Sequence, residues 1–72
     1  MLSIYQNLKK TKTWQTEKRG GHYTIVEIDF QGNIVKAFGN YLTRDSAEKA
    51  LAIFADDSGY RWVGKQKEGE GH

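Results

Sequence analysis

The residues that could act as nucleophiles, bases or metal ligands lie far apart in this 72-residue chain. It has no cysteine and two histidines, and the spacing places neither His22 nor His72 beside Ser3, Ser46 or Ser58. The histidine and glutamate spacings of metal sites are absent, and no glycine-rich phosphate loop precedes the predicted helix. We therefore expect a non-enzymatic protein with no catalytic residue, metal, cofactor or small-molecule substrate.

Basic residues gather in the first part of the chain, where they could bind phosphate groups. Residues 1–22 carry five bases and one acid, whereas residues 23–59 carry three bases and six acids. A basic segment on an acidic body is typical of nucleic-acid contact and equally of a solvated terminus. An aromatic ring within it could stack on a base. The candidate nucleic-acid residues are Lys9, Lys10, Lys12, Trp14, Lys18 and Arg19.

Two adjacent carboxylates, Asp56 and Asp57, stand near the end of the predicted helix. Negative charges at a helix C-terminus oppose the helix dipole. The simpler account is that Asp57 and Ser58 form a turn beyond the last helical residue. The functional account is that this acidic corner contacts a basic patch on a partner.

The elements that position these residues begin with three predicted strands. Residues 14–19 form the first, and Gly20-Gly21 is a strong signal for a two-residue hairpin. Residues 22–30 alternate with period two and form the second strand, and residues 34–41 form the third. Gly39-Asn40 indicates a bulge or bend near the end of the third strand.

A helix is predicted after the third strand. Asp45 and Glu48 have capping-box spacing, and Thr43 is a rival N-cap. Gly59 is the expected stop, and residues 60–63 are a candidate fourth strand. One apolar stripe at helical spacing faces the sheet, and it consists of Ala47, Ala50, Leu51 and Phe54.

These elements predict an α+β fold: a three-stranded antiparallel sheet packed on one face by a single helix, with a short fourth strand at the C-terminus. We expect residues 1–11 to form an N-terminal arm, residues 12–63 the domain and residues 64–72 a flexible tail. Apolar residues make up 38% of the chain, which is too many for a disordered protein. The longest apolar run is six residues, which predicts no membrane span and a cytoplasmic location.

The alternation in residues 22–30 predicts which side of the sheet stays open. If the side with Val26 and Ile28 faces the helix, Tyr23 and Ile25 lie on the open side beside Glu27. An apolar and aromatic patch there would be a protein-contact surface, whereas its carboxylates would repel phosphate. The alternative is that the N-terminal segment covers this face. The predicted protein-contact residues are Tyr23, Ile25, Asp56 and Asp57.

Two family resemblances accompany this layout. The first is carried by Gly32, Ile34, Val35, Tyr41, Ser46, Ala47, Glu48 and Leu51. On these residues the chain resembles the YegP-like bacterial family of unknown function, whose strand–strand–strand–helix units occur in tandem or paired form, and the resemblance implies self-pairing. The second is carried by Trp14, Gly21, Tyr23, Gly32, Gly39, Thr43, Ala47 and Ala50. It is to the three-stranded DNA-binding domains of the plant AP2 and phage-integrase arm-binding type, and it implies DNA contact through the open sheet face.

Three functions follow from these patterns. The leading hypothesis is a small binding module of bacterial or phage type that acts through protein–protein contact, with a protein partner or itself as a homo-oligomer. The alternative is a small nucleic-acid-binding protein that uses the basic segment and first strand. The third is a phage- or plasmid-type inhibitor that docks on a host protein.

Overall fold

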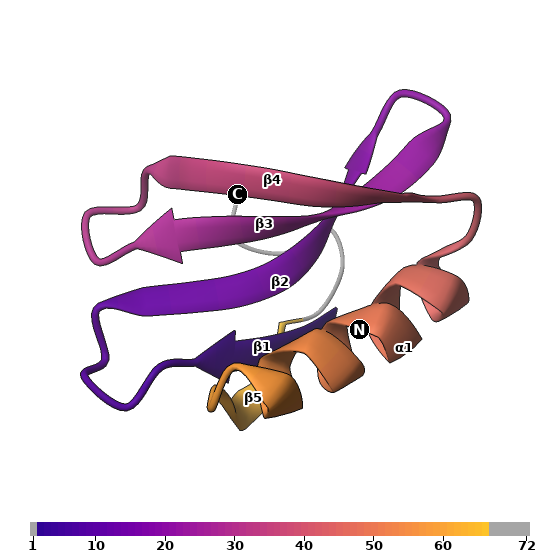
Figure 1. Cartoon of the computed structure of the whole chain (residues 1–72). Helices are drawn as coiled ribbons and strands as arrows, with labels where there is room; N and C mark the ends of the chain where they lie inside the picture. Colours follow the sequence, from indigo (N-terminus) through magenta and orange to yellow (C-terminus); the bar gives the residue numbers. More distant parts are fainter. Residues whose placement is uncertain (1, 67–72) are drawn as a thin grey trace.

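A computed structural model describes residues 2–66, which form a five-stranded antiparallel sheet with one helix packed against it (Figure 1). The spatial order of the strands is β4-β3-β2-β1-β5. The class is α+β, as predicted, although the sheet has two strands more than its expected core of three. The elements are β1 (Leu2–Gln6), β2 (Lys12–Arg19), β3 (His22–Asp29), β4 (Ile34–Tyr41), α1 (Arg44–Asp57) and β5 (Arg61–Gln66).

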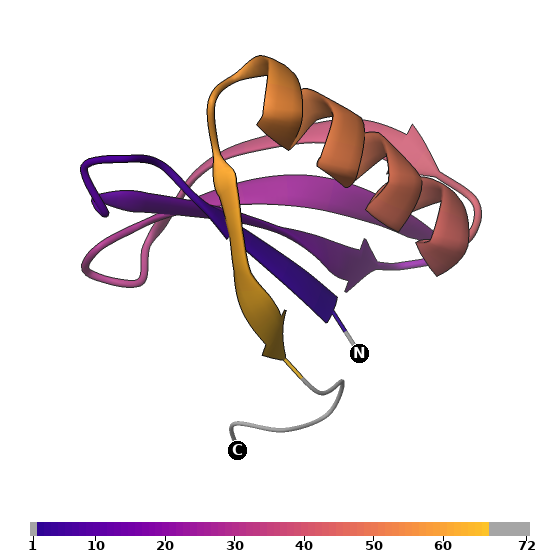
Figure 2. The same cartoon turned by 90° about the horizontal axis from the view of Figure 1, so that it is seen from below.

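The predicted N-terminal arm is wrong, because residues 2–6 form strand β1 inside the sheet. β1 lies between β2 and β5, and Tyr5 is opposite Trp14 on one side and Trp62 on the other. β5 comes from the far end of the sequence and runs to residue 66, so it includes residues expected in the tail (Figure 2). The rest of that predicted tail lies outside the described residues. A pairing between the two ends of the chain leaves no local pattern in either segment.

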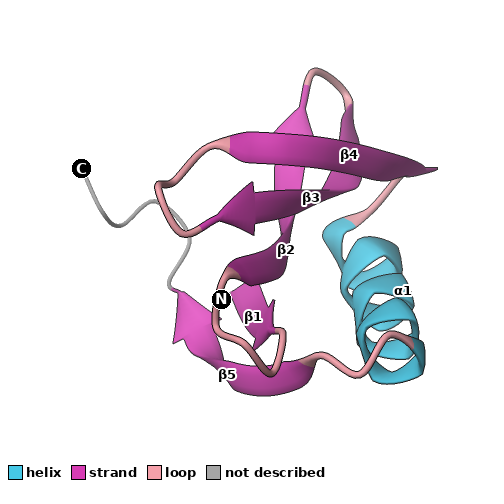
Figure 3. Ribbon diagram, turned by 60° about the vertical axis from the view of Figure 1, so that its left-hand side comes forward, coloured by secondary structure: helices cyan, strands magenta, loops and turns pink. Residues whose placement is uncertain are grey.

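The predicted orientation of β3 is also wrong. Ile25 is 0% exposed and packs with Trp14, Leu51 and Ala55 in the core. Helix α1 lies along one face of the sheet (Figure 3). Register explains this placement, because Ile25 pairs with Phe38, which packs against the same core. Thr24 and Val26 on the other side of β3 are buried too, so burial occurs on both faces of the strand, and its alternation alone cannot indicate which face the helix covers.

The predicted bulge in β4 is confirmed. Pairing with β3 passes from Phe38 opposite Ile25 to Tyr41 opposite Tyr23, which leaves Gly39 and Asn40 facing a single residue. Gly39 has φ +85°, and a Cβ there would lie 2.5 Å from Cε2 of Tyr41. Glycine therefore allows the backbone turn that brings the Tyr41 ring against the core.

Helix α1 begins at the rival N-cap. The Ser46 N–H donates to Oγ1 of Thr43 over 3.2 Å. The Asp45–Glu48 capping box is wrong, because the Glu48 carboxylate instead accepts hydrogen bonds from Ser3 N–H (3.0 Å) and Thr16 Oγ1 (2.6 Å). Glu48 thus ties two strands to the helix.

The far end of α1 corrects the interpretation of the paired carboxylates. Asp56 and Asp57 are the last two helical residues, so the account that put Asp57 in a turn beyond the helix is wrong. Ser58 is the C-cap, and Gly59 follows with φ +78°, which confirms the predicted stop. Both carboxylates are exposed in a last turn that has no basic residue.

Candidate functional site

Glu27 is a structural carboxylate and does not lie on an open face. It is buried, and its Oε2 accepts hydrogen bonds from Trp14 Nε1 (2.8 Å) and the Tyr60 hydroxyl (3.2 Å). Lys12 Nζ lies 3.8 Å from its Oε1. Burial raises the pKa of Tyr60 above 10.0, and the charge and hydrogen bond of Glu27 raise it further. One acid expected to repel phosphate is therefore absent from the molecular surface.

The expected stacking residue is not accessible to a nucleic-acid base. Trp14 is buried, its ring stacks on Tyr60 with centroids 4.2 Å apart, and it meets Phe38 edge-on at 5.4 Å. The placement of Trp14 in a nucleic-acid site is therefore wrong. The aromatic residue instead fills the space between the sheet and the segment that follows α1.

The predicted basic residues fall into two separate groups. Lys9 and Lys10 lie in the β1–β2 turn, with Lys12 just after it at the start of β2. Lys18 and Arg19 lie at the other end of β2. Six residues of extended strand place Lys18 about 20 Å from Lys12. Arg19 Nε is also paired with Glu17 Oε2 at 2.6 Å. The structure therefore does not form one site from all of them.

The predicted protein-contact pair on β3 is not available for docking. Ile25 has no exposed surface, and Tyr23 is half-buried on the same side of the sheet as the helix, with the Arg44 guanidinium 4.9 Å from its ring centroid. Of the predicted protein-contact residues, only Asp56 and Asp57 are exposed.

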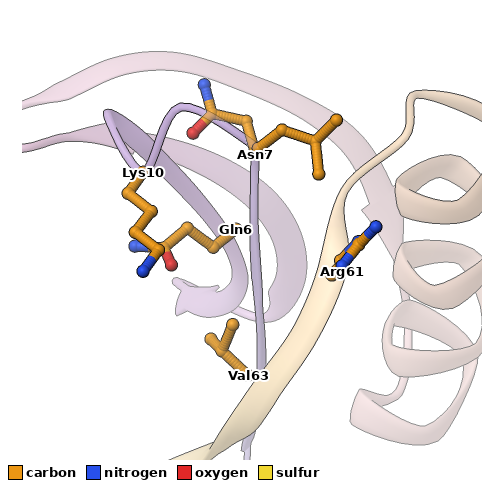
Figure 4. Close-up of a pocket in the computed structure, with 6 residues that line it drawn as sticks. Gln6, Asn7, Lys10, Arg61 and Val63 are labelled. Atoms are coloured by element: carbon orange, nitrogen blue, oxygen red, sulfur yellow. The ribbon is translucent and has the colours of Figure 1, made fainter.

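A pocket of about 140 Å³ lies between the β1–β2 turn and β5 (Figure 4). Lys10 and Arg61 are its charged residues, and both are exposed. No carboxylate among the described residues forms an ion pair with either of them. The pocket is lined by Gln6, Asn7, Leu8, Lys10, Arg61 and Val63.

The turn that presents Lys10 is held in place by Asn7. The Asn7 side-chain oxygen accepts hydrogen bonds from the N–H groups of Thr11 (2.9 Å) and Lys12 (3.1 Å), and its backbone oxygen accepts from Lys10 N–H (3.1 Å). Lys10 has φ +58°, the one positive φ of a non-glycine residue in the described chain. Such a conformation is uncommon and persists where surrounding contacts fix it.

Leu8 and Val63 are exposed at this pocket, and Trp62 is exposed on the other face of the edge strand β5. Leu8 is 69% exposed, Trp62 56% and Val63 53%. We call Leu8, Lys10, Arg61, Trp62 and Val63 the β5-side surface. Of these, sequence analysis had singled out only Lys10. The available signal was the alternation in residues 60–63, which places a large apolar residue on a strand that has a partner on one side only.

A second exposed apolar group lies at the opposite edge of the sheet. It consists of Phe30 in the β3–β4 turn and Ile34 and Val35 in the edge strand β4. Asp29 at this turn is engaged locally, because its Oδ1 accepts hydrogen bonds from the N–H groups of Gln31 and Asn33. The Asp29 carboxylate beside this apolar group therefore already has hydrogen-bond partners within the turn.

A metal-binding cluster is not found in residues 2–66. Within that range no three His, Cys, Asp or Glu residues gather where they could hold a metal ion, and His22 stands half-buried at the start of β3. The one helix in the same range is too short and too polar to cross a bilayer. No protein-family model, curated protein or solved structure matches the chain.

Proposed function

We propose that this chain is a non-catalytic protein-contact module that associates with itself through the β5-side surface. The observation that carries the proposal is the exposure of Leu8 and Val63 at a pocket near the free edge of the sheet, together with that of Trp62 on the other face of the same edge strand. Exposed apolar residues that gather beside polar ones are typical of protein interaction sites.

Trp62 is the expected anchor of the contact. Large aromatic residues contribute most of the binding energy in many interfaces, because they remove much apolar surface from water. Trp62 lies opposite Tyr5 on the helix side of the sheet, beyond the part that α1 covers. It differs in this from Trp14, which the core has already buried.

The size of the molecule is in line with association. A standard interface buries roughly 800 Å² on each partner, about one sixth of the 4865 Å² that this chain exposes. A small domain without disulfides or metal gains much from burying more apolar area. The resemblance of residues 32–51 to the YegP-like family, whose units occur in tandem or paired form, agrees with the same proposal.

We expect side chains to form this contact rather than an added strand. The register of β5 against β1 shifts between Trp62 and Gly64, so Val63 bulges out of the ladder. Bulges bend an edge strand and hinder the pairing of another strand on it. The exposed side chains remain available.

Sedimentation equilibrium from micromolar to millimolar protein tests the proposal. We expect a monomer–dimer equilibrium in the wild type and at least tenfold weaker association in Trp62→Ala, equivalent to about 1.4 kcal/mol or more. Phe30→Ala is the matched control, because it removes an exposed ring at the opposite edge and should leave the equilibrium unchanged. A wild type that stays monomeric at millimolar concentration would contradict self-association.

Nucleic-acid binding is a second candidate, supported by the cations Lys9, Lys10 and Arg61 at one end of the sheet and by the burial of Glu27. It predicts an affinity for duplex or single-stranded DNA that falls steeply with salt and is lost in a Lys9→Gln/Lys10→Gln variant. Absence of binding at low ionic strength would exclude it.

A further inference from the structure

We infer that the pocket of one copy binds the acidic helix end of a second copy, with one of the Asp56 and Asp57 carboxylates inside the pocket. This inference rests on the proposed self-association and names the contact that orients it. The inference is based on two groups of opposite charge that form no ion pair within the described chain. The cations are Lys10 and Arg61, and the carboxylates are Asp56 and Asp57.

The chemistry of the pocket suits a carboxylate on a short stem. The Arg61 guanidinium can donate two parallel hydrogen bonds to a carboxylate, and the Lys10 ammonium adds a second positive charge. The Gln6 amide lies beside Lys10 in the pocket and can donate as well (Figure 4). Its volume of about 140 Å³ is close to the roughly 150 Å³ that holds a benzene-sized molecule, which leaves room for one aspartate side chain.

The position of the two aspartates is electrostatically unfavourable within a single chain. Asp56 and Asp57 are exposed in the last turn of α1, which has no basic residue, so they oppose the helix dipole without a compensating cation. No ion pair joins them to another described residue. A cation supplied by a second copy would relieve this unfavourable arrangement.

The placement of both groups fits a two-fold contact. Only residues 58–60 separate the end of α1 from the start of β5, so the acidic corner and the pocket flank the same edge. Arg61 pairs with Gln6, one position along from Tyr5 and Trp62, so it points away from the helix side. A two-fold axis along the β5 edge would set the helix side of each copy against the pocket side of the other, and both contacts would form at once.

Charge reversal tests the pairing directly. The first variant is Lys10→Glu/Arg61→Glu, which makes the pocket acidic, and the second is Asp56→Lys/Asp57→Lys, which makes the corner basic. We expect each variant alone to dimerise at least tenfold more weakly than wild type, because like charges then face each other. An equimolar mixture should restore a heterodimer to within threefold of the wild-type affinity, because both contacts become complementary again.

The control is Lys18→Glu/Arg19→Glu, which makes the same change of charge at the opposite end of β2 and should leave dimerisation unaltered. Thermal melting and circular dichroism establish that each variant is folded. Dimers that persist in both variants, or a mixture that stays monomeric, would overturn the inference while leaving self-association intact. Saturable binding of phosphate or of a glutamate-rich peptide to the pocket of a monomeric wild type would assign it to another occupant. A monomeric wild type without such binding would overturn the proposed function itself.

Discussion

The core beneath α1 and the β5-side surface both contain tryptophan and charged side chains, but the surroundings of these side chains differ. In the core, the carboxylates of Glu27 and Glu48 accept hydrogen bonds from neutral donors, and the ring of Trp14 has aromatic neighbours on two sides. On the β5-side surface, Trp62 is largely exposed, and Arg61 has no carboxylate partner among the described residues. The first region is satisfied within one chain, whereas we propose that a second copy completes the second region.

This contrast shows why charge counted along a sequence misjudges a surface. Residues 23–59 carry a net negative charge, yet Glu27 is buried and Glu48 holds the sheet to the helix. Among residues 2–66, the acids that remain in solvent are mainly those of the helix.

The largest effect should come from placing a charge in the core. Ile25→Asp buries an unpaired carboxylate at a position with 0% exposure, and we expect it to lower the free energy of unfolding by about 4 kcal/mol or more. Val35→Asp adds the same charge on an exposed edge strand and should change it by less than about 0.5 kcal/mol. Urea denaturation measures both. An Ile25→Asp protein as stable as wild type would show that the core is assigned to the wrong side of β3.

The β4 bulge should give the next largest effect. Gly39→Ala combines a left-handed backbone with a Cβ that would displace the Tyr41 ring, and we expect a loss of about 2–3 kcal/mol in unfolding free energy. Gly32→Ala shares the positive φ but meets open space, so about 1–2 kcal/mol is expected there. The difference between the two melting curves isolates the clash with Tyr41. Equal losses would mean that the ring moves aside freely.

Removing a hydrogen-bonded carboxylate and removing an exposed one should change the stability of the fold in opposite directions. Glu48→Ala leaves the Ser3 N–H and Thr16 hydroxyl without their acceptor, and we expect it to destabilise the fold by about 1–3 kcal/mol. Asp57→Ala removes a charge that opposes the helix dipole, so stability should stay the same or rise by about 0.3–1 kcal/mol. Chemical denaturation of dilute monomer compares them. A destabilised Asp57→Ala monomer would argue that this carboxylate already has a partner within the chain.

The smallest effect concerns alkaline pH. Because the folded state raises the pKa of Tyr60 above 10.0, it holds that proton more tightly than the unfolded chain does. The resulting contribution to stability is complete below pH 10.0 and is lost as the pH rises through the folded-state pKa. Tyr60→Phe should therefore reduce the fall in unfolding free energy above that pH. An unchanged slope across a series of alkaline denaturation curves would be inconsistent with the Glu27–Tyr60 contact.

The middle of the fold could be predicted because its signals are local. Gly20-Gly21 marks the hairpin, Gly39 the bulge and Thr43 the N-cap, and each of these rests on neighbours within a few residues. Strand β1 was missed although it pairs with β2, the next strand along the chain, and only its pairing with β5 joins residues about 60 positions apart. The face of β3 depends on which side carries Trp14 and Phe38, and this follows from register rather than from alternation.

The candidate site was predicted only in part. Lys10, Asp56 and Asp57 stand out in the sequence as charges in unusual places. Arg61 and Trp62 do not, because their exposure depends on β5 being an edge strand. Trp14 and Ile25 were misplaced for the converse reason, since burial is decided by neighbours distant in sequence.

A dilution series followed by amide chemical shifts tests the central claim most directly, because it reports where copies meet. We predict concentration-dependent shifts in residues 8–10, 56–57 and 61–63, with those near Phe30 and Val35 unchanged. Spectra that do not vary with concentration, or shifts centred on β4, would contradict an interface at the β5 edge.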